Sequence, residues 1–532
     1  MRQNPPTTYD QVRYASYPVP QAHPDRLSTL AVLLGLTPAP VTHCRVLELG
    51  CGDGANLIPM AQALPESRFI GLDLAATAVA AGQAQISELQ LGNIELRQLD
   101  ITEAGRELGE FDYIIAHGVY SWVPEAVRER MLALCDELLS PHGVAYISYN
   151  VYPGYHLREM VREMMLYHVR AVSDPEQRVS EGLGLIELLL QQYPNQAAAK
   201  ADLYGAVLIE QIERMNDYKH RTQIFHDELA AINQPVWFHE FIARAAKHNL
   251  QYLAEASFSG MQDHIFSPPV RAFLSRFSAA EIVQKEQYLD FLKCRSFRQT
   301  LLCRRAAPVT RHVSPGRFSD FYAASSARPA TVPPDLRPGV VQEFHGQHGA
   351  VLRTDHPLAK AALWQLGEVS PRALRWAELL EATQARLREA GTGVQVEGNE
   401  RSLAEIMLAA YGAGLVQLHL WQPEMVSTVS ERPLASPLAR WQAQRQSTLT
   451  SLLHQAVEPD DELTRLLLLL LDGTRDHAAL RDELLANMLE RQASVTLPDG
   501  TTHSDRETLR RVIDERLEEN LHKCAQMALL VK

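Results

Sequence analysis

The stretch that decides the fold lies at residues 46–56 and reads Val46-Leu47-Glu48-Leu49-Gly50-Cys51-Gly52-Asp53-Gly54-Ala55-Asn56. An apolar run leads into three glycines spaced two apart, and helical periodicity follows. Glycine permits a tight turn and a close approach of a ligand to the backbone, and the helix that begins there offers free N–H groups. The pattern therefore predicts a strand, a ligand-binding loop and a helix.

Glu48 distinguishes this loop from loops that bind dinucleotides. The spacing G-x-G-x-G differs from G-x-G-x-x-G, in which a pyrophosphate lies on the helix dipole. An acid two residues before the first glycine repels pyrophosphate and attracts an ammonium or sulfonium group. This chemistry points to S-adenosylmethionine (AdoMet) as the ligand. The alternative is a strand-to-helix turn of an unrelated nucleotide-binding fold.

Two further acids follow predicted strands where the same cofactor needs them. Asp73 ends the second strand, 19 residues after Gly54, and can accept hydrogen bonds from both ribose hydroxyls. Asp100 ends the third strand and can accept a hydrogen bond from the adenine amino group, with Ile101 stacked on the ring. The predicted cofactor-binding residues are Glu48, Gly50, Cys51, Gly52, Gly54, Asn56, Asp73, Leu74, Asp100, Ile101 and His117.

Short β-branched or aromatic runs alternate with amphipathic segments from residue 41 to residue 150. Strands are expected at Arg45–Leu49, Arg68–Leu74, Ile94–Leu99, Phe111–Ala116 and Gly143–Tyr149, with helices between them. This alternation predicts βαβ units and a parallel sheet. Strand signals return only at Leu250–Ala256 and Ser296–Cys303, which we expect as strands six and seven. The predicted fold class is α/β, with a Rossmann-like seven-stranded sheet.

A chain of 532 residues is too long for one compact domain. We expect an arm or lid at 1–40, a core at 41–150 and 249–305, a helical insertion at 151–248, a middle domain at 306–430 and a C-terminal domain at 431–532, the last two mainly helical. An amphipathic insertion of this size has to bury its apolar stripe, so we expect a homodimer. Tyr14 and Tyr17 are candidates for a lid over the cofactor, and the alternative is an arm that only covers the sheet edge.

The net charge is −13, and residues 1–150 alone carry 17 acidic and 9 basic side chains. No basic cluster is present, so a nucleic-acid partner is not expected. No apolar run reaches the ~18 residues that span a bilayer, and no signal peptide is visible at the start. The six cysteines are not paired as in a disulfide framework or a zinc site. His220, His226, His239, His248 and His264 are interpreted as helix-face histidines, so no metal is expected, and the location expected is the cytoplasm.

The chain resembles class I methyltransferases that carry a methyltransferase regulatory domain, a group that includes the protein-lysine methyltransferases of rickettsial outer-membrane proteins. The matching segments are 23–27, 44–60, 111–123, 148–154, 252–256, 298–302 and 471–476. The resemblance implies AdoMet as cofactor, a Rossmann-like core, a helical dimerisation insertion, and middle and C-terminal domains that help to hold substrate. It also implies that the substrate is a protein, such as an outer-membrane or surface protein.

The acceptor side is expected beyond the carboxyl ends of the fourth and fifth strands. A lysine must be neutral to attack, and an apolar aromatic pocket lowers its pKa by desolvation. The residues predicted for this pocket are His117, Tyr120, Trp122, Tyr149, Asn150 and Tyr152. His117 is the candidate to take a proton. The alternative is that the aromatic rings pack the strand ends and His117 caps the sheet edge.

Three functions compete at this point. The first is an AdoMet-dependent methyltransferase that acts on lysine side chains of a protein. The second is a small-molecule O- or N-methyltransferase, and the third is a non-catalytic regulatory protein that binds AdoMet. The N/D-P-P-Y/F signature of amide and base-amine methyltransferases is absent after the fourth strand, which counts against glutamine and adenine as substrates.

Overall fold

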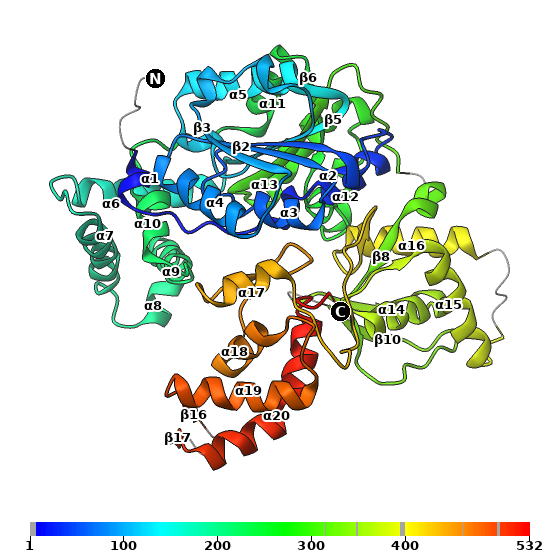
Figure 1. The fold of residues 1–532 in the computed structure, drawn as a ribbon. Coiled ribbons are helices and arrows are strands. Elements are labelled where there is room, and N and C mark those ends of the chain that lie inside the picture. Colours follow the sequence, from blue (N-terminus) through cyan, green and yellow to red (C-terminus); the bar gives the residue numbers. More distant parts are fainter. Residues whose placement is uncertain are drawn as a thin grey trace.

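The computed structural model describes residues 7–313, 315–346, 349–393, 399–459, 461–496 and 501–531. Its centre is a seven-stranded sheet in the order β3-β2-β1-β4-β5-β7-β6 (Figure 1). The strands are β1 (Arg45–Leu49), β2 (Arg68–Asp73), β3 (Ile94–Gln98), β4 (Phe111–Ala116), β5 (Leu139–Asn150), β6 (Leu250–Glu255) and β7 (Phe297–Arg304). Only β7 runs antiparallel to its neighbours β5 and β6. The predicted fold class, α/β with a Rossmann-like seven-stranded sheet, is confirmed.

Helices cover both faces of the sheet because successive side chains of each strand point to opposite faces. On one face α2 (Pro24–Leu33) and α3 (Leu57–Ala63) pack on residues such as Val46 and Tyr146. On the other face α5 (Glu125–Leu138) and α11 (Phe238–Lys247) pack on residues such as Leu47 and Tyr149. This alternation decides which side chains of β5 point toward α11.

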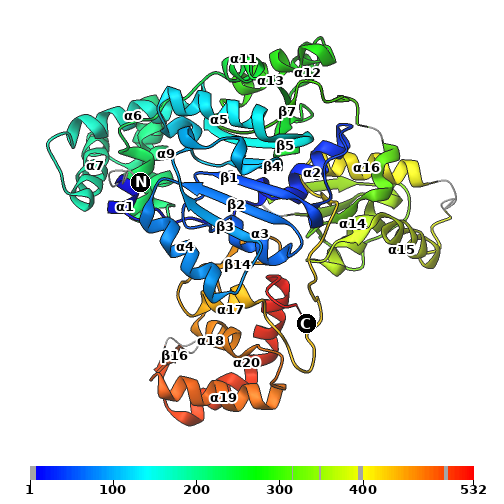
Figure 2. The same cartoon turned by 45° about the horizontal axis from the view of Figure 1, so that its top comes forward.

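The insertion after β5 forms a helical body beside the sheet with an apolar core of its own (Figures 1 and 2). Its helices are α6 (Tyr155–His168), α7 (Pro175–Leu190), α8 (Gln196–Ala201), α9 (Leu203–Asn216) and α10 (Arg221–Glu228). Residues 199–215, whose periodicity in the sequence is that of one helix, are divided between α8 and α9. Asp202 separates α8 from α9 because its side chain accepts the Gly205 N–H and so caps a new helix. Helix α10 was not expected.

The region after β7 combines three helices with two small sheets. The helices are α14 (Pro357–Val369), α15 (Trp376–Glu389) and α16 (Glu400–Gly412). The strands β10 (Gln342–His345) and β11 (Val351–Thr354) pair antiparallel, and residues 347–348 between them lie outside the described residues. The strands β8 (Tyr322–Ala324), β9 (Arg328–Pro329), β12 (Leu374–Arg375) and β13 (Gln417–His419) are too short to give a periodic signal in the sequence.

The C-terminal region packs four helices around a leucine-rich core. They are α17 (Pro437–Ala443), α18 (Glu462–Leu470), α19 (His477–Glu490) and α20 (Arg506–Gln526), with the hairpins β14/β15 (Leu449–Thr450, Ala456–Val457) and β16/β17 (Val495–Thr496, Thr502–His503). Figure 2 shows α17 and β14 beside α4 (Ala76–Glu88) and α3. Across the described ranges no helix combines the length and the apolar character that a bilayer crossing requires.

Candidate active site

The glycine loop turns sharply between β1 and α3 at the carboxyl edge of the sheet. Gly50, Gly52 and Gly54 have φ values of +75°, +56° and +78°, which side-chain-bearing residues rarely adopt. A Cβ atom on Gly50 would lie 2.4 Å from Cγ2 of Val119 in the loop after β4. The loop is therefore held against β4 on one side, and its Gly50 and Cys51 N–H groups donate to the Leu72 carbonyl of β2 on the other.

Glu48 presents an unpaired oxygen to this loop. Its Oε1 accepts a hydrogen bond from Asn56 Nδ2 at 2.8 Å. Its Oε2 is buried and has no hydrogen-bond partner in the part of the chain that the structure describes. Burial raises the pKa of Glu48 to about 8. A buried carboxyl oxygen that lacks a partner fits the positively charged ammonium of AdoMet.

Asp73 and Asp100 stand at the ends of the next two strands. The carboxylate of Asp73 accepts the N–H groups of Gly52 and Ala75 at 2.8 Å each, so the backbone holds it in place. Burial raises the pKa of Asp73 above its ordinary value. Asp100 caps the short helix Ile101–Glu103 by accepting the Thr102 N–H and hydroxyl at 2.8 Å each. The structure thus brings the predicted cofactor residues together along the carboxyl ends of β1 to β4.

The N-terminal arm crosses the glycine loop, and residues 1–6 of it lie outside the described residues. The Val19 N–H donates to Asn56 Oδ1 at 2.9 Å, and Arg13 forms an ion pair with Asp53 at 3.1 Å. Ser16 is so close that a Cβ atom on Gly52 would lie 3.2 Å from its Oγ. The absence of a side chain at Gly52 therefore lets the arm lie directly on the loop.

Helix α10 holds the arm from the outside. The ring of Tyr9 stacks on His226 with 4.3 Å between centroids, and His226 Nε2 lies 2.8 Å from the Val12 carbonyl oxygen. Tyr14 Oη donates to Asp227 Oδ1 at 3.5 Å, and burial raises the pKa of Asp227 to about 6. Tyr9 and Asp227 could not be predicted from the sequence, and His226 was expected only as a helix-face residue, since no local motif marks α10.

His117 lies after β4 with its ring between polar and apolar neighbours. Its Nδ1 is 2.9 Å from Tyr146 Oη and 3.3 Å from Ser148 Oγ, and no motif in the sequence marks these two partners. Phe297, 41% exposed, meets the His117 ring edge-on at 6.2 Å. Burial lowers the pKa of His117 to about 4, so the imidazole is neutral at neutral pH.

Tyr120 and Tyr149 lie in the core instead of facing His117. They are 0% and 1% exposed, and their rings lie 5.1 and 4.1 Å from the ring of Phe241 in α11. The hydroxyl of Tyr149 bonds to Thr300 Oγ1 at 2.9 Å. The pleat of β5 turns Tyr149 toward α11. Tyr120, in the short helix Tyr120–Trp122, packs on the same Phe241 ring. Their placement matches the alternative in which aromatic rings pack the strand ends.

The other residues predicted for the acceptor pocket, Asn150, Trp122 and Tyr152, lie in two different places. The Asn150 main-chain N–H donates to Ser121 Oγ at 2.9 Å, and its side-chain Nδ2 donates to Asn233 Oδ1 at 3.1 Å. Trp122 is half-buried in the short helix Tyr120–Trp122. Tyr152 lies against α6, where its hydroxyl donates to Glu159 and its ring stacks on His156. Asn150 and Trp122 therefore stay near the strand ends, whereas Tyr152 belongs to the insertion.

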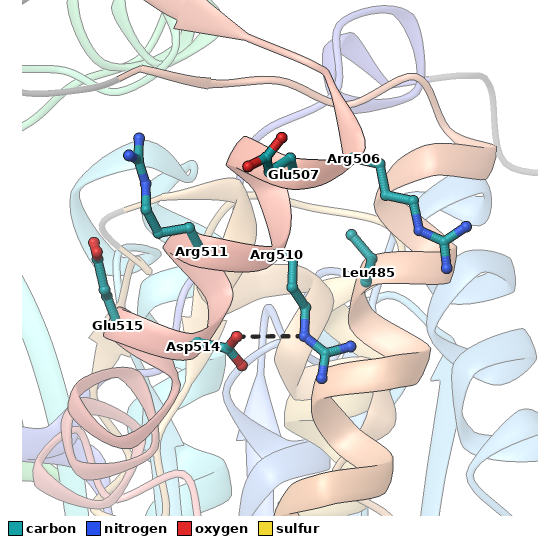
Figure 3. Close-up of a pocket in the computed structure, with 7 residues that line it drawn as sticks. All are labelled: Leu485, Arg506, Glu507, Arg510, Arg511, Asp514 and Glu515. Carbon is teal, nitrogen blue, oxygen red and sulfur yellow. Dashed lines mark hydrogen bonds and ion pairs between the residues drawn. The ribbon is translucent and has the colours of Figure 1, made fainter.

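A groove of about 580 Å³ lies elsewhere, between α19 and α20 (Figure 3). It is lined by Leu485, Arg506, Glu507, Arg510, Arg511, Asp514 and Glu515. Three arginines are balanced by three carboxylates, so the lining has no net attraction for phosphate groups. Among the described residues, no cluster of three or more histidines, cysteines and acids is arranged to hold a metal ion.

Comparison with known proteins assigns the chain region by region. A family model described as "Methyltransferase domain" matches residues 46–143, "Predicted methyltransferase regulatory domain" matches 220–304, and "PKMT, C-terminal winged helix domain" matches 431–529. An uncharacterized protein of Rickettsia prowazekii is 32% identical over 246 residues, which cover 46% of this chain and 96% of that protein. The chain belongs to the class I methyltransferases that carry a methyltransferase regulatory domain.

Two longer matches extend the similarity over almost the whole chain. A second uncharacterized protein of Rickettsia prowazekii is 29% identical over 98% of this chain and 93% of its own length. The structure of PKMT2 from Rickettsia typhi in complex with AdoHcy (S-adenosylhomocysteine) covers 98% of this chain and 100% of that chain, with 26% identity and a TM-score of 0.86. The protein is therefore an AdoMet-dependent methyltransferase.

Proposed function

We propose that this methyltransferase transfers the methyl group of AdoMet to lysine side chains of a protein substrate. The observation that carries the proposal is the likeness to PKMT2, which extends over 98% of the chain at a TM-score of 0.86 and is not limited to the cofactor-binding core. The match to a PKMT winged helix domain at 431–529 supports the same substrate class. Regions this large beside the core suit a macromolecular substrate better than a metabolite.

For the cofactor, we propose roles that follow from the residues at the strand ends. The free Oε2 of Glu48 binds the ammonium, Asp73 accepts the ribose hydroxyls, and Asp100 accepts the adenine amino group. The cofactor supplies a methyl group on a positively charged sulfur. The protein's task is to align the two reactants and to exclude water from between them.

For the acceptor, we propose that His117, Trp122 and Asn150 form the sheet side of the lysine site and that Tyr14 and Asp227 form the arm side. The carboxylate of Asp227 attracts the protonated lysine, and the apolar surroundings lower the pKa of that lysine so that it loses its proton before attack. In the transfer the nitrogen lone pair forms the new N–C bond while the C–S bond breaks. With a pKa of about 4, His117 orients the amine as a neutral imidazole and is a weak base.

Tritiated methyl transfer tests this proposal. The purified protein and labelled AdoMet are added to a lysate of the source cell, which is then separated into protein and small-molecule fractions. Label should appear in protein and, after acid hydrolysis, in methylated lysine. Asp73→Ala, in which AdoMet binding should be weakened, serves as the control and should transfer less label at the same AdoMet concentration. Label confined to small molecules would instead favour the small-molecule methyltransferase, and absence of transfer with retained AdoMet binding would favour the regulatory protein.

We also propose a homodimer through the helical insertion. Several large apolar side chains of α6, α7 and α9 are exposed: Leu157 (40%), Met160 (37%), Tyr167 (70%), Leu188 (60%) and Leu203 (83%). Burial of such side chains against a second copy gains hydrophobic free energy, at ~25 cal/mol per Å². A twofold contact between identical insertions is the simplest way to achieve it.

We propose a separate role for each of the regions expected from the sequence. The arm at 1–40 covers the cofactor, the core at 41–150 and 249–305 binds it, and the insertion at 151–248 pairs two subunits. The regions at 306–430 and 431–532 hold the protein substrate. A cytoplasmic location is supported by the six cysteines, all free thiols and five of them buried, as is usual in a reducing compartment.

A further inference from the structure

The C-terminal region reaches the cofactor loop through the side chain of His454. This residue lies in the turn between β14 and β15, in a left-handed conformation with φ at +57°. It is 5% exposed, and its Nε2 lies 2.8 Å from Oδ1 of Asn56, a residue 398 positions earlier in the chain. Asn56 in turn donates to Glu48, the carboxyl group assigned above to the cofactor ammonium.

The hydrogen bonds around Asn56 determine how its side-chain amide is oriented. The Val19 main-chain N–H can only donate, and it points at the same Oδ1 at 2.9 Å. The amide oxygen of Asn56 therefore faces Val19 and His454, and its Nδ2 faces Glu48. Since Oδ1 can only accept, His454 must carry its proton on Nε2. Burial and the neighbouring His23 lower the pKa of His454, which keeps its ring neutral.

The histidine is supported from behind by two other parts of the chain. The His23 ring of the arm lies 5.1 Å from the His454 ring and stacks on Trp421, with 5.7 Å between centroids. Asp25 accepts the main-chain N–H groups of Leu420 and Trp421 at 2.8 and 2.9 Å. The arm, the middle region and the C-terminal hairpin thus meet next to Asn56, with His23 and His454 buried and Trp421 half-buried.

We infer that His454 is a positioning residue for the AdoMet site. Its Nε2–H holds the Asn56 amide, and this amide fixes the Glu48 carboxyl so that the unpaired Oε2 faces the cofactor ammonium. The inference rests on the cofactor role proposed for Glu48. It gives the winged-helix region at 431–529 a function in cofactor binding that its distance in sequence from the glycine loop does not suggest.

Other contacts join the same region to the core without touching the glycine loop, and they provide a matched control. Glu88 of α4 accepts hydrogen bonds from Trp441 Nε1 at 2.7 Å and from Arg445 at 2.8 Å. Glu88→Ala removes both contacts and leaves His454 in place. If the C-terminal region acts only by docking on the core, Glu88→Ala and His454→Ala should have similar effects.

Calorimetry with two ligands tests the inference on the full-length protein. AdoHcy carries the ammonium, whereas 5′-methylthioadenosine lacks the whole amino-acid end. His454→Ala should weaken AdoHcy binding about tenfold, because the charge-assisted contact between Glu48 and the ammonium is no longer held in place, and should change methylthioadenosine binding by less than about twofold. His454→Gln, whose amide N–H can reach Asn56, should restore most of the AdoHcy affinity. Glu88→Ala should leave both affinities unchanged.

The contrary outcomes are separable. Equal weakening of both ligands by His454→Ala, or the same effect from Glu88→Ala, would show that the histidine only supports docking. An unchanged AdoHcy affinity in His454→Ala, beside a selective loss in Glu48→Gln, would overturn the role of His454 and leave that of Glu48 intact. An unchanged AdoHcy affinity in Glu48→Gln would overturn the proposed contact between Glu48 and the ammonium.

Discussion

The carboxylate of Asp73 accepts the Gly52 N–H at 2.8 Å and so ties the end of β2 to the middle glycine of the cofactor loop. The same carboxylate is the group proposed to accept the ribose hydroxyls. Asp73 therefore shapes the loop and contacts the ligand at once. Its second oxygen is held by the Ala75 N–H at 2.8 Å, so the carboxylate has little freedom to turn away.

Asp73→Ala should weaken AdoMet binding by about 1–3 kcal/mol, because charge-assisted hydrogen bonds to the ribose are lost. Isothermal titration calorimetry measures the change. Glu88→Ala is the control, since Glu88 is a carboxylate of the core that contacts Trp441 and Arg445 and not the cofactor loop. An affinity equal to that of the wild type would remove Asp73 from the cofactor site.

Glu48 should release a proton when AdoMet binds below about pH 8. Burial raises the pKa of Glu48 to about 8 in the free protein, so the carboxyl is protonated at neutral pH, and a bound ammonium favours its charged form. Calorimetry in two buffers of different ionisation enthalpy detects the released proton. Glu48→Gln should abolish the buffer dependence attributed to this group.

The same burial should destabilise the free protein as pH rises. When folding raises the pKa of a carboxyl group, the folded protein becomes less stable as the pH rises above the ordinary pKa of 4.5. This loss of stability grows until about pH 8. Glu48→Gln should therefore unfold at a higher temperature than the wild type at pH 8 and show little difference at pH 5. Equal shifts at the two pH values would contradict a titrating Glu48.

Tyr149→Phe and Asn150→Ala should separate stability from catalysis. Loss of the Tyr149 hydroxyl removes its bond to Thr300 and should cost about 1 kcal/mol in urea unfolding, with turnover near that of the wild type. Asn150→Ala should lower turnover about ten- to hundredfold at unchanged AdoMet affinity, because a misaligned amine raises the barrier. Normal turnover in Asn150→Ala would remove Asn150 from the acceptor site.

Methyl transfer should become slower at acidic pH because Asp227 is then protonated. Its pKa is raised to about 6 by burial, so the carboxylate that attracts the substrate lysine is charged above pH 6 and neutral below it. In the wild type, kcat/KM should fall in a step as the pH drops through 6. In Asp227→Asn, kcat/KM should be lower at neutral pH and should show no step near pH 6. Since Tyr14 donates to Asp227, Tyr14→Phe should shift the step to higher pH. A step that persists in Asp227→Asn belongs to another group.

Light scattering should give a mass near twice the 59.6 kDa of one chain at micromolar concentration. Leu203→Glu together with Leu188→Glu should shift the mass toward that of the monomer, because charges cannot be buried in an apolar contact. Thr42→Glu, on an exposed residue of the core, is the control. A wild-type mass near 60 kDa would refute the proposed dimer.

The sequence alone determined the sheet and the cofactor loop. The strands β1 to β4 were predicted to within a residue or so, because the alternation of apolar runs with helical periodicity is written locally along the chain. Glu48, Asp73 and Asp100 could be named because each lies within two residues of the carboxyl end of a strand, and parallel strands bring these ends to one edge. These inferences need only short-range pattern and the known layout of parallel sheets.

Only the tertiary structure decided what surrounds that loop. Tyr149 and Asn150 are adjacent in sequence, yet the pleat of β5 sends Tyr149 into the core against α11. Asp227 meets Tyr14 from 213 positions away, and His454 meets Asn56 from 398. Such contacts arise when separate helices and hairpins pack their apolar faces together, and no local periodicity in the chain specifies which polar side chains this packing brings face to face.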